Sequence, residues 1–154
     1  NIVKDVLENI ERYSAANNHY VFEITETIEM DQIPAVQNVF KEFVKNEFRF
    51  AIDDFGTGYS NYGYMRDRTF DIVKVDRSFV TDIDKLKDNY LMVSFIIKMA
   101  HEMGLHVCIE GVETKEELSC VKKLGADYIQ GYYYGKPVCL QDFEEQHLKR
   151  FVLG

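Results

Sequence analysis

Five short apolar runs recur along the chain, and each ends in a polar residue that can bind a metal, a proton or a phosphate. Amphipathic segments of helical period separate most of these runs. Strands that alternate with helices form right-handed βαβ units around a parallel sheet, and in a barrel of such units the strand ends converge on one site. The runs and their terminal residues are 20–22 with Glu23, 48–52 with Asp53, 71–73 with Lys74, 105–109 with Glu110, and 128–129 with Gln130. The pattern predicts an α/β protein with a site where the strands end.

Helices are predicted between and around these strands. Pro34 lies in the first turn of one of them, and Gly104 follows the longest one as a C-terminal cap. Thr114 and Glu117 form a capping-box sequence, and Gly125 closes the helix that follows it. The predicted helices span 2–13, 31–46, 86–103, 114–125 and 140–152.

Asp53 and Asp54 are adjacent at the end of the second run, and the flexible turn Gly56-Thr57-Gly58 follows them. One carboxylate can bridge two divalent cations while its neighbour binds the second, and glycine lets the backbone approach a phosphate without a Cβ clash. A surface Asx turn is the alternative for this motif alone, because acidic residues and glycine also begin ordinary turns. The recurrence of polar strand ends favours the metal site.

Composition limits the classes of function. The chain has 154 residues, 46% of them hydrophobic, which suffices for one domain with a substantial core. It contains no window of about 18 apolar residues and no signal peptide at its start, so we expect a cytoplasmic protein. The net charge of -8 argues against polymeric nucleic acid as a partner, whereas acidic residues at strand ends suit a cation site that an anionic substrate approaches.

Other constellations are weaker. The four histidines include no His-x-x-x-His pair and the three cysteines no Cys-x-x-Cys pair, so the sequence indicates neither a zincin-type site nor structural zinc. Tyr132, Tyr133 and Tyr134 follow Gln130 and Gly131 closely. They either stack on a nucleobase or form the wall at a barrel rim, and the sequence leaves both interpretations open.

The same residues resemble, in order and spacing, the successive signatures of EAL-type cyclic di-GMP phosphodiesterases. These signatures are FEITET at 22–27, DDFGTGYS at 53–60, DIVKVDRSFV at 71–80, EGVET at 110–114, and QGY at 130–132 with KP at 136–137. The resemblance covers nearly the whole chain. It implies a TIM-like (β/α) barrel with one strand reversed, here a partial barrel of about five strands with flanking helices. The implied reaction is hydrolysis of one phosphodiester of cyclic di-GMP to the linear dinucleotide, in bacterial signalling.

The resemblance also implies a two-metal site for Mg²⁺ or Mn²⁺. Glu23 would bind the first metal, Asp53 would bridge both, and Asp54 and Glu110 would bind the second. Lys74 would orient the attacking water or steady developing charge. Two cations about 3.5 to 4 Å apart lower the pKa of a shared water and neutralise charge on the attacking and leaving oxygens.

The resemblance implies roles for four further residues. Gln130 would hold a metal-bound water, and Glu26 would anchor the loop that starts at Asp53. Asp76 and Glu113 would act as supporting acidic groups. From the residues alone, Glu113 has a second interpretation as a cap of the helix that follows it.

The chain also departs from the family pattern. No Glu-Ala-Leu motif, whose glutamate binds a metal, and no metal-binding asparagine precede Phe22. We therefore expect residues 1–154 to be the C-terminal part of a single EAL-type domain and inactive in isolation. The resemblance implies sensor or diguanylate cyclase domains in the parent protein, which a membrane anchor can accompany. A part-barrel leaves two sheet edges and one open side of its core, so we also expect a homo-oligomer.

Two other functions stay open at this stage. A nonhydrolytic cyclic di-GMP receptor or regulatory interaction domain would bind the nucleotide without turnover. An enolase-type barrel enzyme would use Lys74 as a base and Asp53 and Glu110 as metal ligands, and it would leave the Asp-Asp-Phe-Gly turn unexplained.

Overall fold

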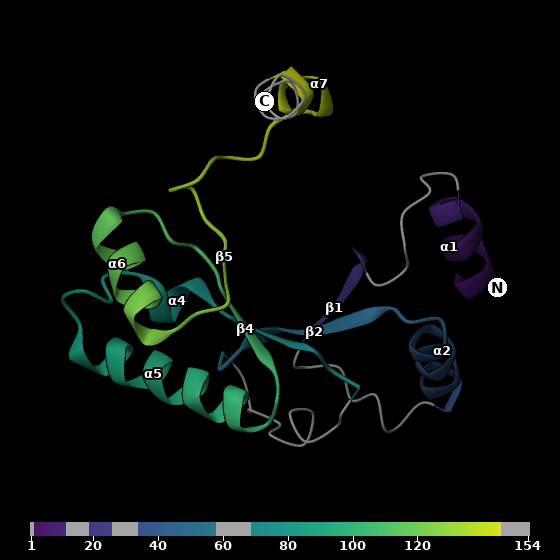
Figure 1. The fold of residues 1–154 in the computed structure, drawn as a ribbon, viewed down its shortest axis with the longest axis horizontal. Coiled ribbons are helices and arrows are strands. Elements are labelled where there is room, and N and C mark those ends of the chain that lie inside the picture. Colours follow the sequence, from purple (N-terminus) through teal and green to yellow (C-terminus); the bar gives the residue numbers. More distant parts are fainter. Residues whose placement is uncertain (1, 12–18, 26–33, 58–68, 146–154) are drawn as a thin grey trace.

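The computed structural model describes residues 2–11, 19–25, 34–57 and 69–145 of the chain. Strands and helices alternate along most of this length (Figure 1). The strands are β1 (Val21–Thr25), β2 (Arg49–Phe55), β3 (Ile72–Val75), β4 (His106–Ile109) and β5 (Tyr128–Ile129). The helices are α1 (Ile2–Glu11), α2 (Pro34–Lys45), α4 (Arg77–Val80), α5 (Lys87–Glu102), α6 (Lys115–Leu124) and α7 (Leu140–Phe143).

The strands form one parallel sheet in the order β1-β2-β3-β4-β5. Each strand therefore pairs with its neighbour in sequence, and the carboxyl ends of all five lie at the same edge. The five predicted strands and the parallel arrangement are confirmed. Among the described residues the sheet is open, so it is a part of a TIM-like barrel and not a closed one.

Helices cover one face of the sheet and build the core with it. An aromatic cluster joins α2 to β1 and β2, with the rings of Phe22 and Phe43 4.7 Å apart and those of Phe40 and Phe50 4.1 Å apart. On the same face, near β4, α5 buries an apolar stripe that includes Val93. Burial of such side chains contributes roughly 1.5 to 3 kcal/mol each.

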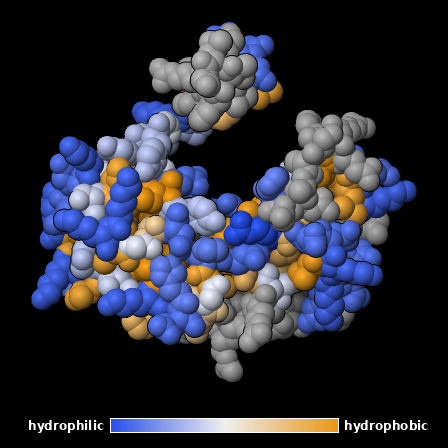
Figure 2. Space-filling model, in the orientation of Figure 1, coloured by the Kyte–Doolittle hydropathy of each residue, from blue (hydrophilic) through white to orange (hydrophobic). Residues whose placement is uncertain are grey.

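The opposite face is hollow. Figure 2 shows an open concavity between α7 and the part of the molecule that carries α1 and α2. A strand of a parallel barrel sends alternate side chains to the helices and to the interior, so this hollow is lined by the other half of every strand. None of the helices in the described ranges is long and apolar enough to cross a membrane.

Helices α5 and α6 end as their capping sequences predict. Thr114 and Glu117 form the capping box of α6, and Gly125 ends that helix with a φ of 90°. Helix α5 ends at Glu102, two residues before Gly104, whose φ is 80°. Sequence reasoning missed α4, which has four residues, and the predicted starts and ends at 12–13, 31–33 and 146–152 lie outside the described residues.

Candidate functional site

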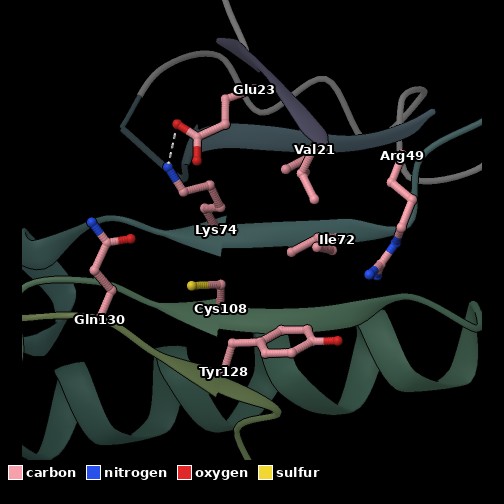
Figure 3. A pocket seen from close by; sticks show the side chains of 9 residues that line it. Val21, Glu23, Arg49, Ile72, Lys74, Cys108, Tyr128 and Gln130 are labelled. Atoms are coloured by element: carbon pink, nitrogen blue, oxygen red, sulfur yellow. Dashed lines mark ion pairs between the residues drawn. The ribbon is translucent and has the colours of Figure 1, made fainter. Parts of the chain in front are cut away.

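Strand alternation places the predicted site residues on the hollow face. In β1, Phe22 packs on the core, whereas Glu23 points the other way. In β3, Val73 packs on the core, and Lys74 lines the hollow with Glu23. The same alternation holds in β4 and β5, so that Gln130 also faces the hollow (Figure 3). The sheet thus brings together side chains that lie more than a hundred residues apart in the sequence, Glu23 and Gln130.

Lys74 lies at the centre of the site. Its Nζ is 2.8 Å from a carboxylate oxygen of each of Glu23, Asp53 and Glu110. Only 6% of Lys74 is exposed, and burial by itself disfavours a charged ammonium. The carboxylates of Asp53, Glu110 and Glu23 outweigh that burial and raise the pKa of Lys74 above its usual value. Lys74 is therefore a fixed cation at neutral pH.

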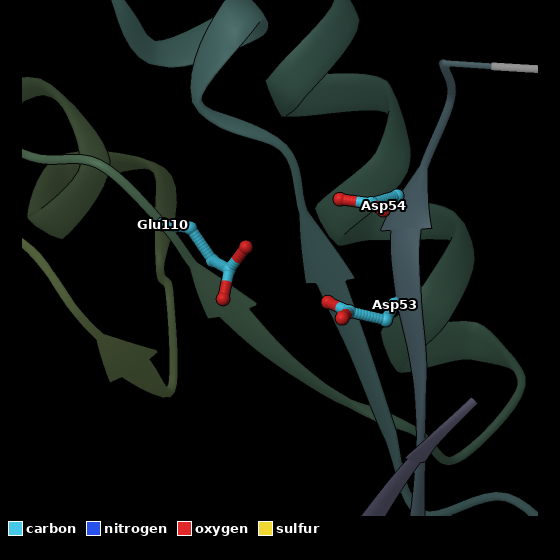
Figure 4. Close-up of side chains that lie close together, drawn as sticks. All are labelled: Asp53, Asp54 and Glu110. Carbon is cyan, nitrogen blue, oxygen red and sulfur yellow. The ribbon is translucent and has the colours of Figure 1, made fainter. Parts of the chain in front are cut away.

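A local irregularity aims Asp53 and Asp54 to one side of β2. On a regular strand, adjacent side chains point to opposite faces. The register with β3 shifts between Ile52 and Phe55, and Asp54 adopts a φ of 55°, in the left-handed region. Both carboxylates consequently turn toward Glu110 (Figure 4). The Asp-Asp pair in the sequence indicated two ligands but gave no sign of this bulge.

Asp53, Asp54 and Glu110 fit a divalent cation. Each offers an oxygen, and these three oxygens lie within 4.8 Å of one another. Asp53 Oδ1 is buried, and it lies 2.8 Å from the ammonium of Lys74. Carboxylate oxygens are the ligands that Mg²⁺ and Mn²⁺ prefer. With Glu23, the site carries four carboxylates and one ammonium, so bound cations would relieve its excess negative charge.

A cavity of about 230 Å³ extends from Glu23, Lys74 and Gln130 along the hollow face. Val21, Ala51 and Ile72 form its apolar wall, and Arg49 and Tyr128 lie at the end away from Lys74 (Figure 3). Cys108 also lines the cavity. Burial, followed by the charge of Glu110, raises the pKa of the Cys108 thiol to about 11. This environment does not favour the thiolate form of Cys108.

The remaining predicted residues occupy distinct places. Asp76 is the N-cap of α4, where its side chain accepts a hydrogen bond from Ser78 N at 2.9 Å. Burial opposes ionisation of Asp76, but the side chain of Ser78 and the N–H groups of Ser78 and Arg77 lower the pKa of that carboxyl below its usual value. Glu113 lies beside α6 and does not cap it, since Thr114 fills that position. Glu26 lies outside the described residues.

The tyrosine segment forms a second hollow next to Gln130. Tyr132 and Tyr134 line a groove of about 570 Å³ that continues to Phe143 of α7. Lys136 Nζ lies 5.4 Å from the ring centroid of Tyr132, a cation–π contact. The groove is compatible with both interpretations of the tyrosines, as a wall or as a stacking surface.

Comparison with known proteins identifies the family of this chain. A family model described as EAL domain matches residues 1–137. The chain belongs to the EAL domain family. The match contains every predicted site residue, from Glu23 to Gln130.

Named relatives extend the comparison. A protein of Escherichia coli (strain K12), named as the probable cyclic di-GMP phosphodiesterase PdeA, is 35% identical over 142 residues, which cover 92% of this EAL chain and 20% of that protein. The solved structure of the EAL enzyme Bd1971 with cAMP and cyclic di-GMP is 34% identical with a TM-score of 0.84, over 93% of this chain and 38% of that one. BlrP1 of Klebsiella pneumoniae, solved with manganese and cyclic di-GMP, is 28% identical with a TM-score of 0.78, over 88% of this chain and 34% of that one. The chain thus spans well under half the length of these relatives.

Proposed function

We propose that this EAL chain contributes the metal-binding and catalytic residues for hydrolysis of cyclic di-GMP to the linear dinucleotide. The observation that carries the proposal is the cluster of Asp53, Asp54 and Glu110, whose three carboxylate oxygens lie within 4.8 Å of one another. A phosphodiester is an anion, and three clustered carboxylates would repel it unless cations lay between them. The cluster is therefore best explained as a site for Mg²⁺ or Mn²⁺ that receives the substrate's phosphate.

The residues have separate tasks in this proposal. Asp53 would be shared between two cations, with Glu23 on one side and Asp54 and Glu110 on the other. Bound cations supply an acidified water and neutralise charge on the phosphate oxygens. Lys74 holds the carboxylates of Glu23, Asp53 and Glu110 in place through its 2.8 Å contacts and presents positive charge toward the reacting phosphate.

Gln130 supports the same site from β5. Its backbone N–H donates to Ile109 O at 2.8 Å, which fixes Gln130 next to the strand end that precedes Glu110. In the proposal its side-chain amide orients a water at the cations, because an amide can both donate and accept. Asp76 and Glu113 act through the loops that carry them, and Glu26 keeps its proposed role in anchoring the loop at Asp53.

The relatives support the substrate. PdeA is named as a probable cyclic di-GMP phosphodiesterase, and Bd1971 and BlrP1 were solved with cyclic di-GMP bound. BlrP1 was also solved with manganese, which agrees with the oxygen ligands of the cluster. We propose that residues 1–154 form part of a single EAL domain that acts beside sensor or diguanylate cyclase domains.

We also propose that two copies of the chain associate through the outer face of α5. Leu91 and Phe95 stand one turn apart on that face and are 54% and 57% exposed. An isologous contact places the same surface on both copies. A two-fold axis perpendicular to α5 at the level of Val93 sets Leu91 against Phe95 of the second copy. It also sets Asp88 against Lys98 of the second copy, so apolar groups and opposite charges meet.

The test of the proposed reaction is hydrolysis of cyclic di-GMP by the full-length product of the gene that encodes this chain. We expect linear dinucleotide to form with Mn²⁺ or Mg²⁺, and Asp53→Asn to lower kcat by at least about 10³-fold, because that change removes charge from the shared ligand. Asp84→Asn, an exposed acid outside the site, is the matched control and should retain activity. Binding of cyclic di-GMP without turnover would instead identify a receptor.

A further inference from the structure

Glu117 is a buried acid that the proposed reaction does not use. Only 6% of it is exposed, as little as for Lys74. It lies in the first turn of α6, on the side that faces the loops between the strands and the helices. Buried carboxylates are costly unless their oxygens are hydrogen-bonded, so the partners of Glu117 show what its charge holds together.

Both oxygens of Glu117 accept hydrogen bonds from backbone N–H groups. Oε2 accepts from Glu113 N at 2.9 Å and from Thr114 N at 3.0 Å, while Oε1 accepts from Asp82 N at 3.1 Å. Burial opposes ionisation, but the N–H groups of Glu113, Thr114 and Asp82 lower the pKa of Glu117 below its usual value. The bond from Thr114 belongs to the capping box of α6. Those from Glu113 and Asp82 go beyond it, and Asp82 lies on another loop.

These two loops follow the strands that carry the site. Asp82 belongs to the segment after β3, eight residues beyond Lys74, and Glu113 is three residues beyond Glu110. Two further contacts hold the loop after β4. A Cβ on Gly111 would lie 2.3 Å from Arg77 Cβ, so the loop packs tightly on α4, and Val112 N donates to Gln130 O at 3.2 Å. Of the contacts that hold these two loops, those of Glu117 are the ones made by a charged acceptor.

We propose that Glu117 is a positioning residue for the site, which fixes Glu110 relative to Lys74 by fastening the loops after β3 and β4 to each other. This inference rests on the proposed function. Hydrogen bonds to charged acceptors are stronger than neutral ones, so one buried carboxylate can hold both loops. A ligand whose supporting contacts are lost typically loses about 10 to 100-fold in metal affinity or activity.

The direct test is Glu117→Gln in the full-length gene product. Glutamine keeps the shape of the side chain but offers one accepting oxygen, and its NH₂ group cannot accept a hydrogen bond, so one of the two loops loses its partner. We expect kcat to fall about 10 to 100-fold and the Mn²⁺ concentration for half-maximal activity to rise, with KM for cyclic di-GMP little changed. Hydrogen exchange of the amides at 110–114 in metal-free protein should become faster.

Two controls separate positioning from a loss of stability. Thr114→Val removes the hydroxyl that accepts from Glu117 N at 3.2 Å and weakens the helix cap, but it leaves both oxygens of Glu117 with their loop partners. It should lower the melting temperature without raising the Mn²⁺ requirement. Glu116→Gln makes the same charge change on the exposed neighbour and should alter neither. If Glu117→Gln does not fold, Glu117→Asp, which shortens the carboxylate's reach, takes its place in the same measurements.

The outcomes distinguish the two proposals. An inactive wild-type protein that also fails to bind Mn²⁺ would overturn the proposed function. A wild-type protein that hydrolyses cyclic di-GMP, together with a folded Glu117→Gln variant of unchanged kcat, Mn²⁺ requirement and exchange at 110–114, would overturn the positioning role alone. A rise in the Mn²⁺ requirement in Glu117→Gln but not in Thr114→Val would support it.

Discussion

At the centre of the site, Lys74 carries one positive charge among the carboxylates of Glu23, Asp53 and Glu110. Each contact is 2.8 Å, and Lys74 itself is almost completely buried. Removing one partner of a buried ionic group leaves the others uncompensated, which costs more than the net value of the contacts. Lys74 thus stabilises the acidic site as well as serving the proposed chemistry.

This leads to a prediction for Lys74→Met. The variant should lose about 1 to 3 kcal/mol of unfolding free energy in metal-free buffer, a figure reduced because Glu23 is half-exposed. In Mn²⁺ the deficit should shrink, since bound cations replace the missing positive charge. Urea unfolding with and without Mn²⁺ measures both values, with the exposed Lys122→Met as control. An equal loss of unfolding free energy with and without Mn²⁺ would show that bound cations do not replace the charge of Lys74.

The residue types at the site could be predicted from the sequence, because polar residues ended apolar runs at Glu23, Asp53 and Glu110. Their common orientation follows from strand alternation, which needs only the strand positions. The bulge at Asp54 could not be predicted, since it depends on the pairing of β2 with β3 and on a φ of 55°. The clustering of three carboxylates on one ammonium could not be predicted either, because it is a tertiary contact.

At the scale of elements, the loops after the strands determine where the site residues lie. The loop after β4 is pressed against the segment after β5, where a Cβ on Gly131 would lie 2.1 Å from Val112 O. Val112 also accepts a hydrogen bond from Tyr133 N at 3.0 Å. Because these atoms belong to the backbone, they have no rotamer by which to move aside. Glycine at 131 lets Glu110 and Gln130 approach each other.

Gly131→Ala should therefore destabilise the protein by about 1 to 3 kcal/mol and lower its activity, because the added methyl group forces the two loops apart. Gly135→Ala is a matched control four residues away, since a Cβ there meets nothing within 4 Å. Thermal unfolding and hydrolysis rates of the two variants make the comparison. Equal melting temperatures for the two variants would show that the close approach to Val112 is not needed.

Sequence signals predicted some helices accurately and missed another. The capping box at Thr114 and Glu117 located the start of α6 to the residue, because capping depends on adjacent residues. The sequence did not indicate α4, since four residues give no helical periodicity. It also gave only part of the role of Glu117, because the bond from Asp82 N crosses 35 positions.

For the whole molecule, the helix-covered face offers a surface for association between copies of the chain. The helix side is a packed core, but α5 still exposes Leu91 and Phe95 to solvent. Adjacent exposed apolar side chains bordered by charges are typical of contact surfaces. One helix face is small for a stable interface, so we expect weak, concentration-dependent association.

Charge reversal on α5 tests that association. Asp88→Lys and Lys98→Asp should each shift the protein toward monomer, because each places like charges opposite one another in the two-fold pair. The double variant restores opposite charges and should associate as the wild type does. Sedimentation velocity over a range of concentrations measures the effect. If the single variants associate like the wild type, or the double variant stays monomeric, another surface is responsible.

In the proposed site, Asp53, Asp54 and Glu110 together hold a divalent cation. The most direct measurement is the anomalous scattering of Mn²⁺ in crystals of the full-length gene product. We expect a Mn²⁺ peak bound by oxygens of all three carboxylates at about 2.0 to 2.4 Å, and we expect Asp53→Asn to remove this peak. An active protein whose Mn²⁺ lies elsewhere, or whose peak is unchanged in Asp53→Asn, would contradict the proposed site.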